Sequence, residues 1–481
     1  MKLLRTAVVG AALATLTSVL PASASTTLVW QNAKEVTLPS GAQGLNQGYL
    51  PTLSCVSSGN CVAGGGYNNA TSNETGIILT ETNGTWTTPT TLRAPAGAAA
   101  APLLTIESLS CGAIGNCAVV GDYQDKSGNI EGFVANEDNN VWSAGVKLAL
   151  PTNALGKGQD AIVRSVVCHS ASNCSAVGSY LDNLAAAPRT VGFVVSEVRG
   201  SWQRAKEITF VNATNFNPFA TTNQIACSST GNCSAVGSFI DVNGVSKGFV
   251  INQEKSTWSK AVSLVLPANA SAFSGVTLSE VACAGASCSV LGTYLTSTGA
   301  TEALSASSSN GTWHRASELA MPSGAASNPH VFLYGFLGIG CASTKNCAAG
   351  GQYRDSVGNY EGFLVNEVNG TWTSAVELSL PAGGLQTGAN GGVVAVSCPS
   401  AGNCRAGAAY LDGSGNYQAL TVIEDNGIWR QGTRVTLPVG ATTVGIDGGV
   451  YALVCRSVDV CTAVGSYLKT TTLYEGFTLS S

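Results

Sequence analysis

Residues 360–381 read YEGFLVNEVNGTWTSAVELSLP, and this stretch decides how the chain is organised. The C-terminal residues 474–481, YEGFTLSS, repeat only its beginning. Residues 27–39, TLVWQNAKEVTLP, repeat only its end. One repeating unit is therefore divided between the two ends of the chain. A ring in which the two partial units join into one explains this division, because closure leaves no free edge.

Cysteines mark the same repeat. The 16 cysteines form close pairs, and the first cysteines of successive pairs are 56 to 59 residues apart, a period that indicates a repeat architecture. An even number in a secreted chain predicts eight local disulfides. The expected bridges join Cys55 with Cys61, Cys111 with Cys117, Cys168 with Cys174, Cys227 with Cys233, Cys283 with Cys288, Cys341 with Cys347, Cys398 with Cys404 and Cys455 with Cys461. A zinc site would favour two-residue spacing and more than the 3 histidines present, so we expect no metal and no cofactor.

Each unit contains four strand-length apolar stretches. In the sixth unit these are residues 334–341, 347–353, 360–367 and 371–381. The cysteine loop joins the first two, and turns rich in Asp, Ser, Gly and Asn join the others. Four strands in up-and-down order, repeated at this period, describe one blade of a β-propeller.

Aromatic residues recur once per unit at two positions. A tryptophan opens each fourth strand: Trp30, Trp86, Trp142, Trp202, Trp258, Trp313, Trp372 and Trp429. A tyrosine or phenylalanine closes each second strand: Tyr67, Tyr123, Tyr180, Phe239, Tyr294, Tyr353, Tyr410 and Tyr467. We interpret both sets as packing between blades rather than as ligand contacts.

These counts predict an all-β chain with a single eight-bladed β-propeller over residues 25–481, in which residues 25–39 supply the outer strand of the last blade. A linear solenoid is the alternative, and it would require capping repeats with a polar face.

The first 24 residues have the pattern of a secretory signal peptide. Lys2 and Arg5 precede an apolar run, and Ala22-Ser23-Ala24 resembles a cleavage site. We expect a secreted protein, extracellular or periplasmic, with no membrane span. Charged residues make up only 11% and the net charge is -5, so nucleic acid is not an expected partner. We expect a monomer.

The unit resembles the kelch repeat and other repeats of secreted bacterial propellers. The shared features are a glycine pair ending the second strand (Gly65-Gly66, Gly350-Gly351), an aromatic residue after it, and tryptophan in the fourth strand. The resemblance implies the propeller fold over the whole mature chain. Most units have Val-Gly at the glycine pair, the period is longer, and kelch repeats do not require the cysteines.

The loops that enter each first strand vary most between units, and we expect them to share a face with the loops between second and third strands. Aromatic residues with sparse polar groups suit a sugar or another small amphipathic ligand. The candidate ligand-binding residues are Tyr49, Lys157, Asp160, Phe216, Phe219, His330, Phe332, Tyr334 and Asp447. The alternative is that Phe332, Tyr334 and Phe336 alternate in an inner strand and pack against neighbours.

Acidic residues also recur. Asp125, Asp241, Asp355 and Asp412 each begin a turn that ends in glycine, which favours a backbone-bonded turn over a calcium loop. Glu81, Glu137, Glu197, Glu367 and Glu424 each precede tryptophan by five residues, and we interpret them as turn or edge residues. No motif identifies a catalytic residue.

The sequence therefore favours a binding scaffold for a surface glycan or an extracellular protein. The alternatives are an extracellular carbohydrate-active enzyme, a glycoside hydrolase or lyase, and a structural envelope protein without ligand. A single cluster of acidic side chains at the mouth of the channel would favour the enzyme.

Overall fold

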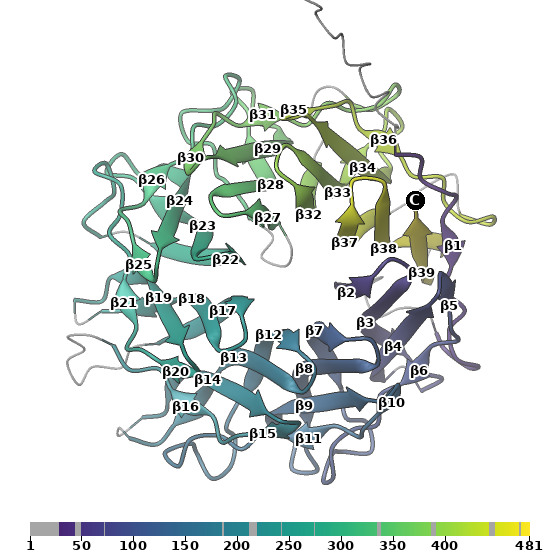
Figure 1. Ribbon diagram of the computed structural model, residues 1–481, viewed down its shortest axis with the longest axis vertical. Helices are drawn as coiled ribbons and strands as arrows, with labels where there is room; N and C mark the ends of the chain where they lie inside the picture. The colour runs from purple at the N-terminus through teal and green to yellow at the C-terminus, as the bar shows by residue number, and fades with distance from the viewer. Residues whose placement is uncertain are drawn as a thin grey trace, which may run out of the picture.

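Eight antiparallel sheets form a ring around a central channel in the computed structural model (Figure 1). The structure describes residues 28–43, 50–71, 73–184, 187–210, 219–241, 243–273, 275–333, 338–385, 391–441, 448–470 and 473–481. Within these ranges the regular elements are all β-strands. Each sheet is one blade, numbered here by its cysteine pair. In blades 1 to 7 the first four strands follow chain order from the channel outward, and in blade 8 the outermost strand is β1. The predicted eight-bladed propeller is confirmed.

The strands of the first four blades are as follows. Blade 1 contains β2 (Thr52–Ser57), β3 (Asn60–Asn68), β4 (Glu74–Thr82), β5 (Thr85–Trp86) and β6 (Thr90–Thr91). Blade 2 contains β7 (Thr105–Ala113), β8 (Asn116–Gln124), β9 (Ile130–Asp138), β10 (Val141–Trp142) and β11 (Val146–Lys147). Blade 3 contains β12 (Ile162–Ser170), β13 (Asn173–Asp182), β14 (Arg189–Val198), β15 (Ser201–Trp202) and β16 (Lys206–Glu207). Blade 4 contains β17 (Thr221–Ser229), β18 (Asn232–Ile240), β19 (Ser246–Glu254), β20 (Thr257–Trp258) and β21 (Val262–Ser263).

The other four blades repeat this pattern. Blade 5 contains β22 (Val276–Ala284), β23 (Ser287–Leu295), β24 (Thr301–Ser309), β25 (Thr312–Trp313) and β26 (Ser317–Glu318). Blade 6 contains β27 (Ile339–Ser343), β28 (Asn346–Arg354), β29 (Tyr360–Val368), β30 (Thr371–Trp372) and β31 (Val376–Glu377). Blade 7 contains β32 (Gly392–Ser400), β33 (Asn403–Leu411), β34 (Tyr417–Asp425), β35 (Ile428–Trp429) and β36 (Thr433–Arg434). Blade 8 contains β37 (Gly449–Ser457), β38 (Val460–Thr470), β39 (Leu473–Ser480) and β1 (Lys34–Glu35).

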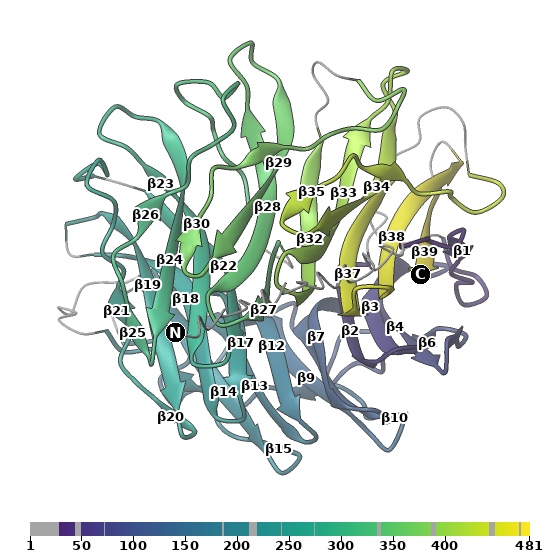
Figure 2. The ribbon, with the colours of Figure 1, turned by 45° about the horizontal axis from the view of Figure 1, so that its top comes forward.

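Blade 8 is closed by the N-terminal strand, as predicted. β1 pairs antiparallel with β39, with Lys34 opposite Thr478. The Glu35 carboxylate accepts hydrogen bonds from the Tyr467 hydroxyl at 2.7 Å and from Lys469 Nζ at 2.6 Å. The tilted view shows blade 8 beside blade 1 (Figure 2). Strands from both ends of the chain therefore share one sheet.

The outer strand differs from the continuous strand that the sequence suggested. In each of blades 1 to 7 it forms two separate two-residue segments. Between them the chain turns to the preceding blade, where the amide of Ala375 donates to the carbonyl of Ala320 at 2.8 Å. The amide of Ala205 bonds the carbonyl of Ala149 in the same way, also at 2.8 Å. At the break, the backbone amide forms a hydrogen bond with the preceding blade instead of with the third strand of its own blade.

All eight predicted disulfides are present, one in each blade, and no cysteine of the described residues is free. Each bridge fastens the first strand of a blade to the second, and in blade 3 the two bridged Cα atoms are 4.0 Å apart. Such disulfide density is typical of proteins that mature in an oxidising compartment. In blade order the bridges join Cys55 with Cys61, Cys111 with Cys117, Cys168 with Cys174, Cys227 with Cys233, Cys283 with Cys288, Cys341 with Cys347, Cys398 with Cys404 and Cys455 with Cys461.

The hydrophobic cores lie between neighbouring blades. One core joins Leu291 and Ala303 of blade 5 to Tyr353 and Phe363 of blade 6, with Trp372 packed against it. The hydroxyl of Tyr353 reaches the outer strand and donates to Glu377 Oε2 at 2.9 Å. The recurrent aromatic residues thus pack blade against blade, as predicted.

The recurrent glutamates are buried, so their interpretation as turn or edge residues is wrong. Glu424 is 1% exposed and accepts hydrogen bonds from Asn366 Nδ2 of the preceding blade at 2.6 Å and from the Cys404 amide at 2.9 Å. Burial raises the pKa of Glu424, and it raises the pKa of Glu137 to about 7. These carboxyl groups belong to the interfaces between blades.

The acidic turns have the predicted structure. Oδ1 of Asp355 accepts from the amides of Val357 at 3.0 Å and Asn359 at 2.7 Å, and Gly358 adopts a φ of 102°. Oδ1 of Asp125 accepts from the amides of residues 127 and 129 in the same manner. Their carboxylates serve the turn itself.

Candidate functional site at the channel mouth

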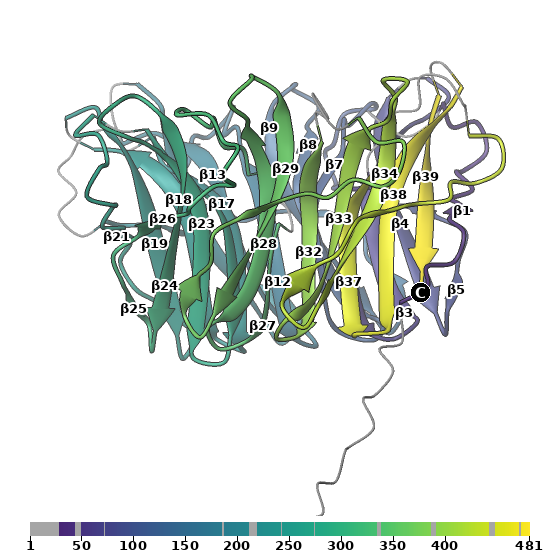
Figure 3. The ribbon, with the colours of Figure 1, turned by 90° about the horizontal axis from the view of Figure 1, so that it is seen from above.

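The two faces of the ring carry different loops. The loop entering blade 6 bridges the turn between its second and third strands, where Ala325 pairs with Asp355. On the opposite face the turn between third and fourth strands contacts the cysteine loop, with the Gly370 amide 2.9 Å from the Lys345 carbonyl. We call these the upper and lower faces (Figure 3). The predicted grouping of the loops is confirmed.

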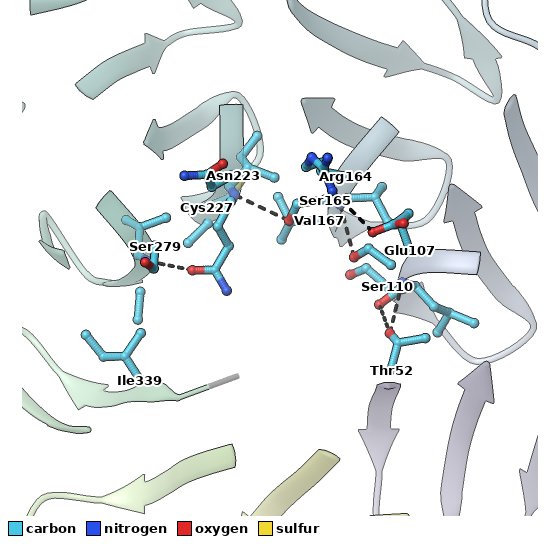
Figure 4. Close-up of a pocket in the computed structure, with 18 of the residues that line it drawn as sticks. Thr52, Glu107, Ser110, Arg164, Ser165, Val167, Asn223, Cys227, Ser279 and Ile339 are labelled. Carbon is cyan, nitrogen blue, oxygen red and sulfur yellow. Dashed lines mark hydrogen bonds and ion pairs between the residues drawn. The ribbon is translucent and has the colours of Figure 1, made fainter. Parts of the chain in front are cut away.

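A cavity of about 670 Å³ occupies the channel. The inner strands of blades 1 to 6 line it, and the close-up shows side chains from several of them around an open centre (Figure 4). A cavity of this size falls within the range of about 300–1,000 Å³ that is usual for ligand sites.

One position in the inner strands gives the channel its asymmetry. It is the fourth residue before the first cysteine of each blade. In blades 2, 3, 4, 5, 7 and 8 this residue forms a β-bulge, because it has no partner in the pairing of the first strand with the second. The residues in those blades are Glu107, Arg164, Asn223, Ser279, Val394 and Tyr451 in that order. A bulge re-aims its side chain, and the four polar ones line the cavity. The channel therefore has a polar sector on blades 2 to 5.

Acidic groups gather on the upper side of this sector. Burial, together with the negative charges of Glu107 and Glu74, raises the pKa of Asp122 to about 7. Burial also raises the pKa of Glu107, while Arg164, whose Nη1 lies 3.9 Å from Glu107 Oε2, opposes that shift. Asp160 contributes a further negative charge. We call Glu74, Glu107, Asp122 and Asp160 the acidic cluster. A carboxyl that titrates near neutrality beside another carboxyl is suited to donating and accepting protons.

Exposed aromatic side chains occur on blades 4 to 6 of the same face. Phe219, Phe273 and Phe332 are 52%, 85% and 47% exposed, and each lies in the loop entering its blade. Every other phenylalanine, tyrosine and tryptophan within the described ranges is buried or half-buried. We call these three residues the aromatic arc.

Phe332 is held in place. Its backbone exchanges two hydrogen bonds with Gln352, at 2.8 and 3.0 Å. Its ring stacks on His330 with centroids 6.4 Å apart and contacts Tyr360 at 5.8 Å. Phe332 pairs with the second strand but stays 47% exposed, and Tyr334 and Phe336, on which the alternative of an inner strand packed against neighbours also depends, lie outside the described residues.

The predicted site residues divide into three groups. Phe219, His330 and Phe332 belong to the aromatic arc or support it, and Asp160 belongs to the acidic cluster. Lys157 is exposed in the loop entering blade 3, and no role in the site follows from its position. Tyr49, Phe216, Tyr334 and Asp447 lie outside the described residues.

Sequence reasoning missed Glu74, Glu107 and Asp122. Aligning the units on their cysteines and tyrosines would have found two of them. Asp122 is the only acidic residue among those that directly precede the aromatic residue of the second strand. Glu107 is the only acidic residue at the bulge position. An acidic residue at a position where every other repeat has a residue of another type was the pattern that could have revealed both.

Within the described residues, no cluster of histidine, cysteine, aspartate or glutamate is arranged to hold a metal ion. None of the described elements is a helix long and apolar enough to cross a membrane.

Comparisons with known proteins do not identify a family. No protein-family model matches the chain, and no curated protein matches it. A polysaccharide lyase, the PL25 ulvan lyase, is similar over 81% of this chain and 92% of its own, with 12% identity and a TM-score of 0.43. A Dyadobacter fermentans protein of unknown function is similar over 94% of this chain and 98% of its own, with 10% identity and a TM-score of 0.36. The Trypanosoma rangeli sialidase is similar over 83% and 56%, with 12% identity and a TM-score of 0.34.

Proposed function

We propose that the protein is a glycan-binding propeller, secreted after removal of residues 1–24, that binds its ligand on the upper face. One observation carries the proposal: the only exposed phenylalanine, tyrosine or tryptophan side chains of the described residues lie in three consecutive entry loops, beside a channel mouth lined by polar bulge residues. Sugars have C–H faces that pack on aromatic rings and hydroxyls that bond carboxylates, amides and hydroxyl groups. The arc and the polar sector offer both.

The test is a glycan array together with a panel of soluble polysaccharides, probed with residues 25–481. Binding should weaken about tenfold or more in F273A and F332A, since truncating a contact residue commonly costs about 1.4 kcal/mol or more. Ile114→Ala is the matched control, because Ile114 is 55% exposed but lies in a cysteine loop of the lower face. Equal affinity in all three variants would overturn the proposal, as would binding only to an extracellular protein or to nothing.

A second candidate function is a carbohydrate-active enzyme, a hydrolase or lyase. The acidic cluster favours it, because Asp122 can be protonated near neutral pH while Glu107 lies beside it. Such a pair supplies an acid and a base to sugar chemistry. Release of reducing ends or unsaturated ends from a bound polysaccharide, lost in D122N but retained in I114A, would establish turnover. Binding without product release would exclude it for that polysaccharide.

A further inference from the structure

A second large cavity lies away from the channel, between the outer parts of blades 6 and 7. Its volume is about 700 Å³, close to that of the channel cavity. The end of β29 and residues 373–379 form one side, and residues 424–430 form the other. These blades are neighbours in the ring (Figure 1). We call this cavity the 6/7 groove.

Equivalent grooves at two other interfaces are smaller. The groove between blades 3 and 4 has a volume of about 220 Å³, and the one between blades 8 and 1 consists of two adjoining parts of about 170 Å³ and 310 Å³. The residues one, two and four places after tryptophan line all three grooves. They are Gln203, Arg204 and Lys206 in blade 3, Gln31, Asn32 and Lys34 in blade 8, but Thr373, Ser374 and Val376 in blade 6. Of these three grooves, the one of largest volume has the shortest side chains at these positions.

The inner wall of the 6/7 groove is rigid. The indole N–H of Trp429 donates to Asn366 Oδ1 at 2.9 Å, and Asn366 Nδ2 donates to Glu424 Oε1 at 2.6 Å. The second oxygen of Glu424 accepts from the Cys404 amide at 2.9 Å. This chain of hydrogen bonds fixes the orientation of the indole ring that lines the groove. The groove therefore has its shape before any ligand arrives.

The outer walls are apolar and the rim is polar, and the exposed carboxylate at the rim, Glu377, accepts a hydrogen bond from the Tyr353 hydroxyl. Val368, Val376 and Ile428 line the groove and are 49%, 46% and 58% exposed. Ser374 and Asn426 are exposed at its edge. The cation there, Arg430, is paired with Asp425 Oδ2 at 2.9 Å. In the smaller grooves a lysine occupies the position of Val376, so the 6/7 groove lacks a charge that its counterparts carry.

We propose that the 6/7 groove is a second binding site and that it accepts a neutral saccharide unit. An aromatic ring fixed by its N–H, aliphatic walls and short hydroxyl and amide side chains match a pyranose, which has apolar C–H faces and a polar edge. An anionic ligand would have to leave water for walls where the cation, Arg430, is already paired. The site lies at the edge of the ring and is independent of the upper face.

The test replaces the blade 6 side chains by those of blade 3. The probes are maltohexaose, cellohexaose and laminarihexaose, measured by calorimetry in an F273A/F332A background so that only binding away from the aromatic arc is counted. At least one probe should bind this background, and adding T373Q/S374R/V376K should weaken it at least tenfold. The opposite exchange, Q203T/R204S/K206V, should enlarge the groove between blades 3 and 4 and raise the stoichiometry.

The outcomes separate this site from the upper-face proposal. If no probe binds the background, or if neither exchange changes affinity or stoichiometry, the 6/7 groove is not a saccharide site. Binding of an apolar peptide in place of every sugar also overturns it. The thermal midpoint of each variant shows whether it is folded, and the blade 3 exchange gives an answer even if the blade 6 variant does not fold. Failure of the upper-face proposal is recognised separately, by an unchanged affinity in F273A/F332A.

Discussion

The lower and upper faces of the ring are built by the same strands, but they differ in what they repeat. On the lower face every blade has a disulfide beside a short turn, such as Cys347 near the turn at Gly370. On the upper face the bulge position changes from Glu107 to Arg164 to Asn223 in consecutive blades. Contacts that every blade needs cannot define a single site. Residues that occur once are therefore the ones available for binding.

The largest expected effect comes from opening the ring. Deleting residues 25–39 removes the buried side chains of Leu28 and Val36, whose burial stabilises the fold by about 3–6 kcal/mol. It also removes the carboxylate that binds Tyr467 and Lys469. We expect the truncated chain to lose cooperative unfolding, or to unfold far earlier in urea, when followed by circular dichroism. A truncated chain that unfolds like residues 25–481 would disprove ring closure.

Removing one of the eight disulfides should lower the free energy of unfolding by less than opening the ring does. We expect replacement of both Cys55 and Cys61 by alanine to cost about 2 kcal/mol or less, because the loop closed by this bridge is short and its hairpin is already ordered. Urea unfolding measures the loss. A reductant acting on all eight bridges should lower the thermal midpoint by more than the single pair does. An unchanged midpoint in reductant would mean that the lower-face disulfides do not stabilise the scaffold.

Buried carboxyl groups between blades should make stability depend on pH. The pKa of Glu137 is raised by burial to about 7, above its ordinary value of 4.5, so the folded state holds a proton that the unfolded state releases. This contribution is complete below pH 4.5 and is lost as the pH rises to about 7. We expect E137Q to flatten the fall in unfolding free energy between pH 4.5 and about pH 7 by on the order of 1 kcal/mol. An identical pH profile in E137Q would contradict this.

The smallest effect on stability should come from the upper face. Phe273 is 85% exposed, so F273A should change the unfolding free energy by less than about 0.5 kcal/mol. Phe249, which is fully buried in a core between blades, provides the contrast, since F249A should cost about 3–5 kcal/mol. Urea denaturation of the F273A and F249A variants measures the two losses of unfolding free energy and shows whether binding residues can change without loss of stability. A comparable loss in both would remove the distinction between the two faces.

Repetition explains which features the sequence could predict. The cysteine pairs, the tryptophans and the two partial end units recur in register, so blade number, disulfides and ring closure followed from counting. The burial of Glu424 did not follow, because its partner Asn366 belongs to another blade. Asp160 was predicted as a site residue, but its place in the acidic cluster did not follow from the sequence, since Glu74, Asp122 and Asp160 come from three different blades. A residue that differs from its counterparts in the other repeats can be found from the sequence, but which residues it meets is set by the geometry of the ring.

Closure by β1 also bears on where the ring can be cut. The amide of Gln31 donates to the carbonyl of Ser480 at 2.9 Å, at the place where other blades have a short turn between third and fourth strands. The junction of Gln31 and Ser480 is thus one of eight nearly equivalent places to cut the ring. A circularly permuted chain, joined from residue 481 to residue 28 and opened at the turn near Gly370, would contain every contact between blades described above.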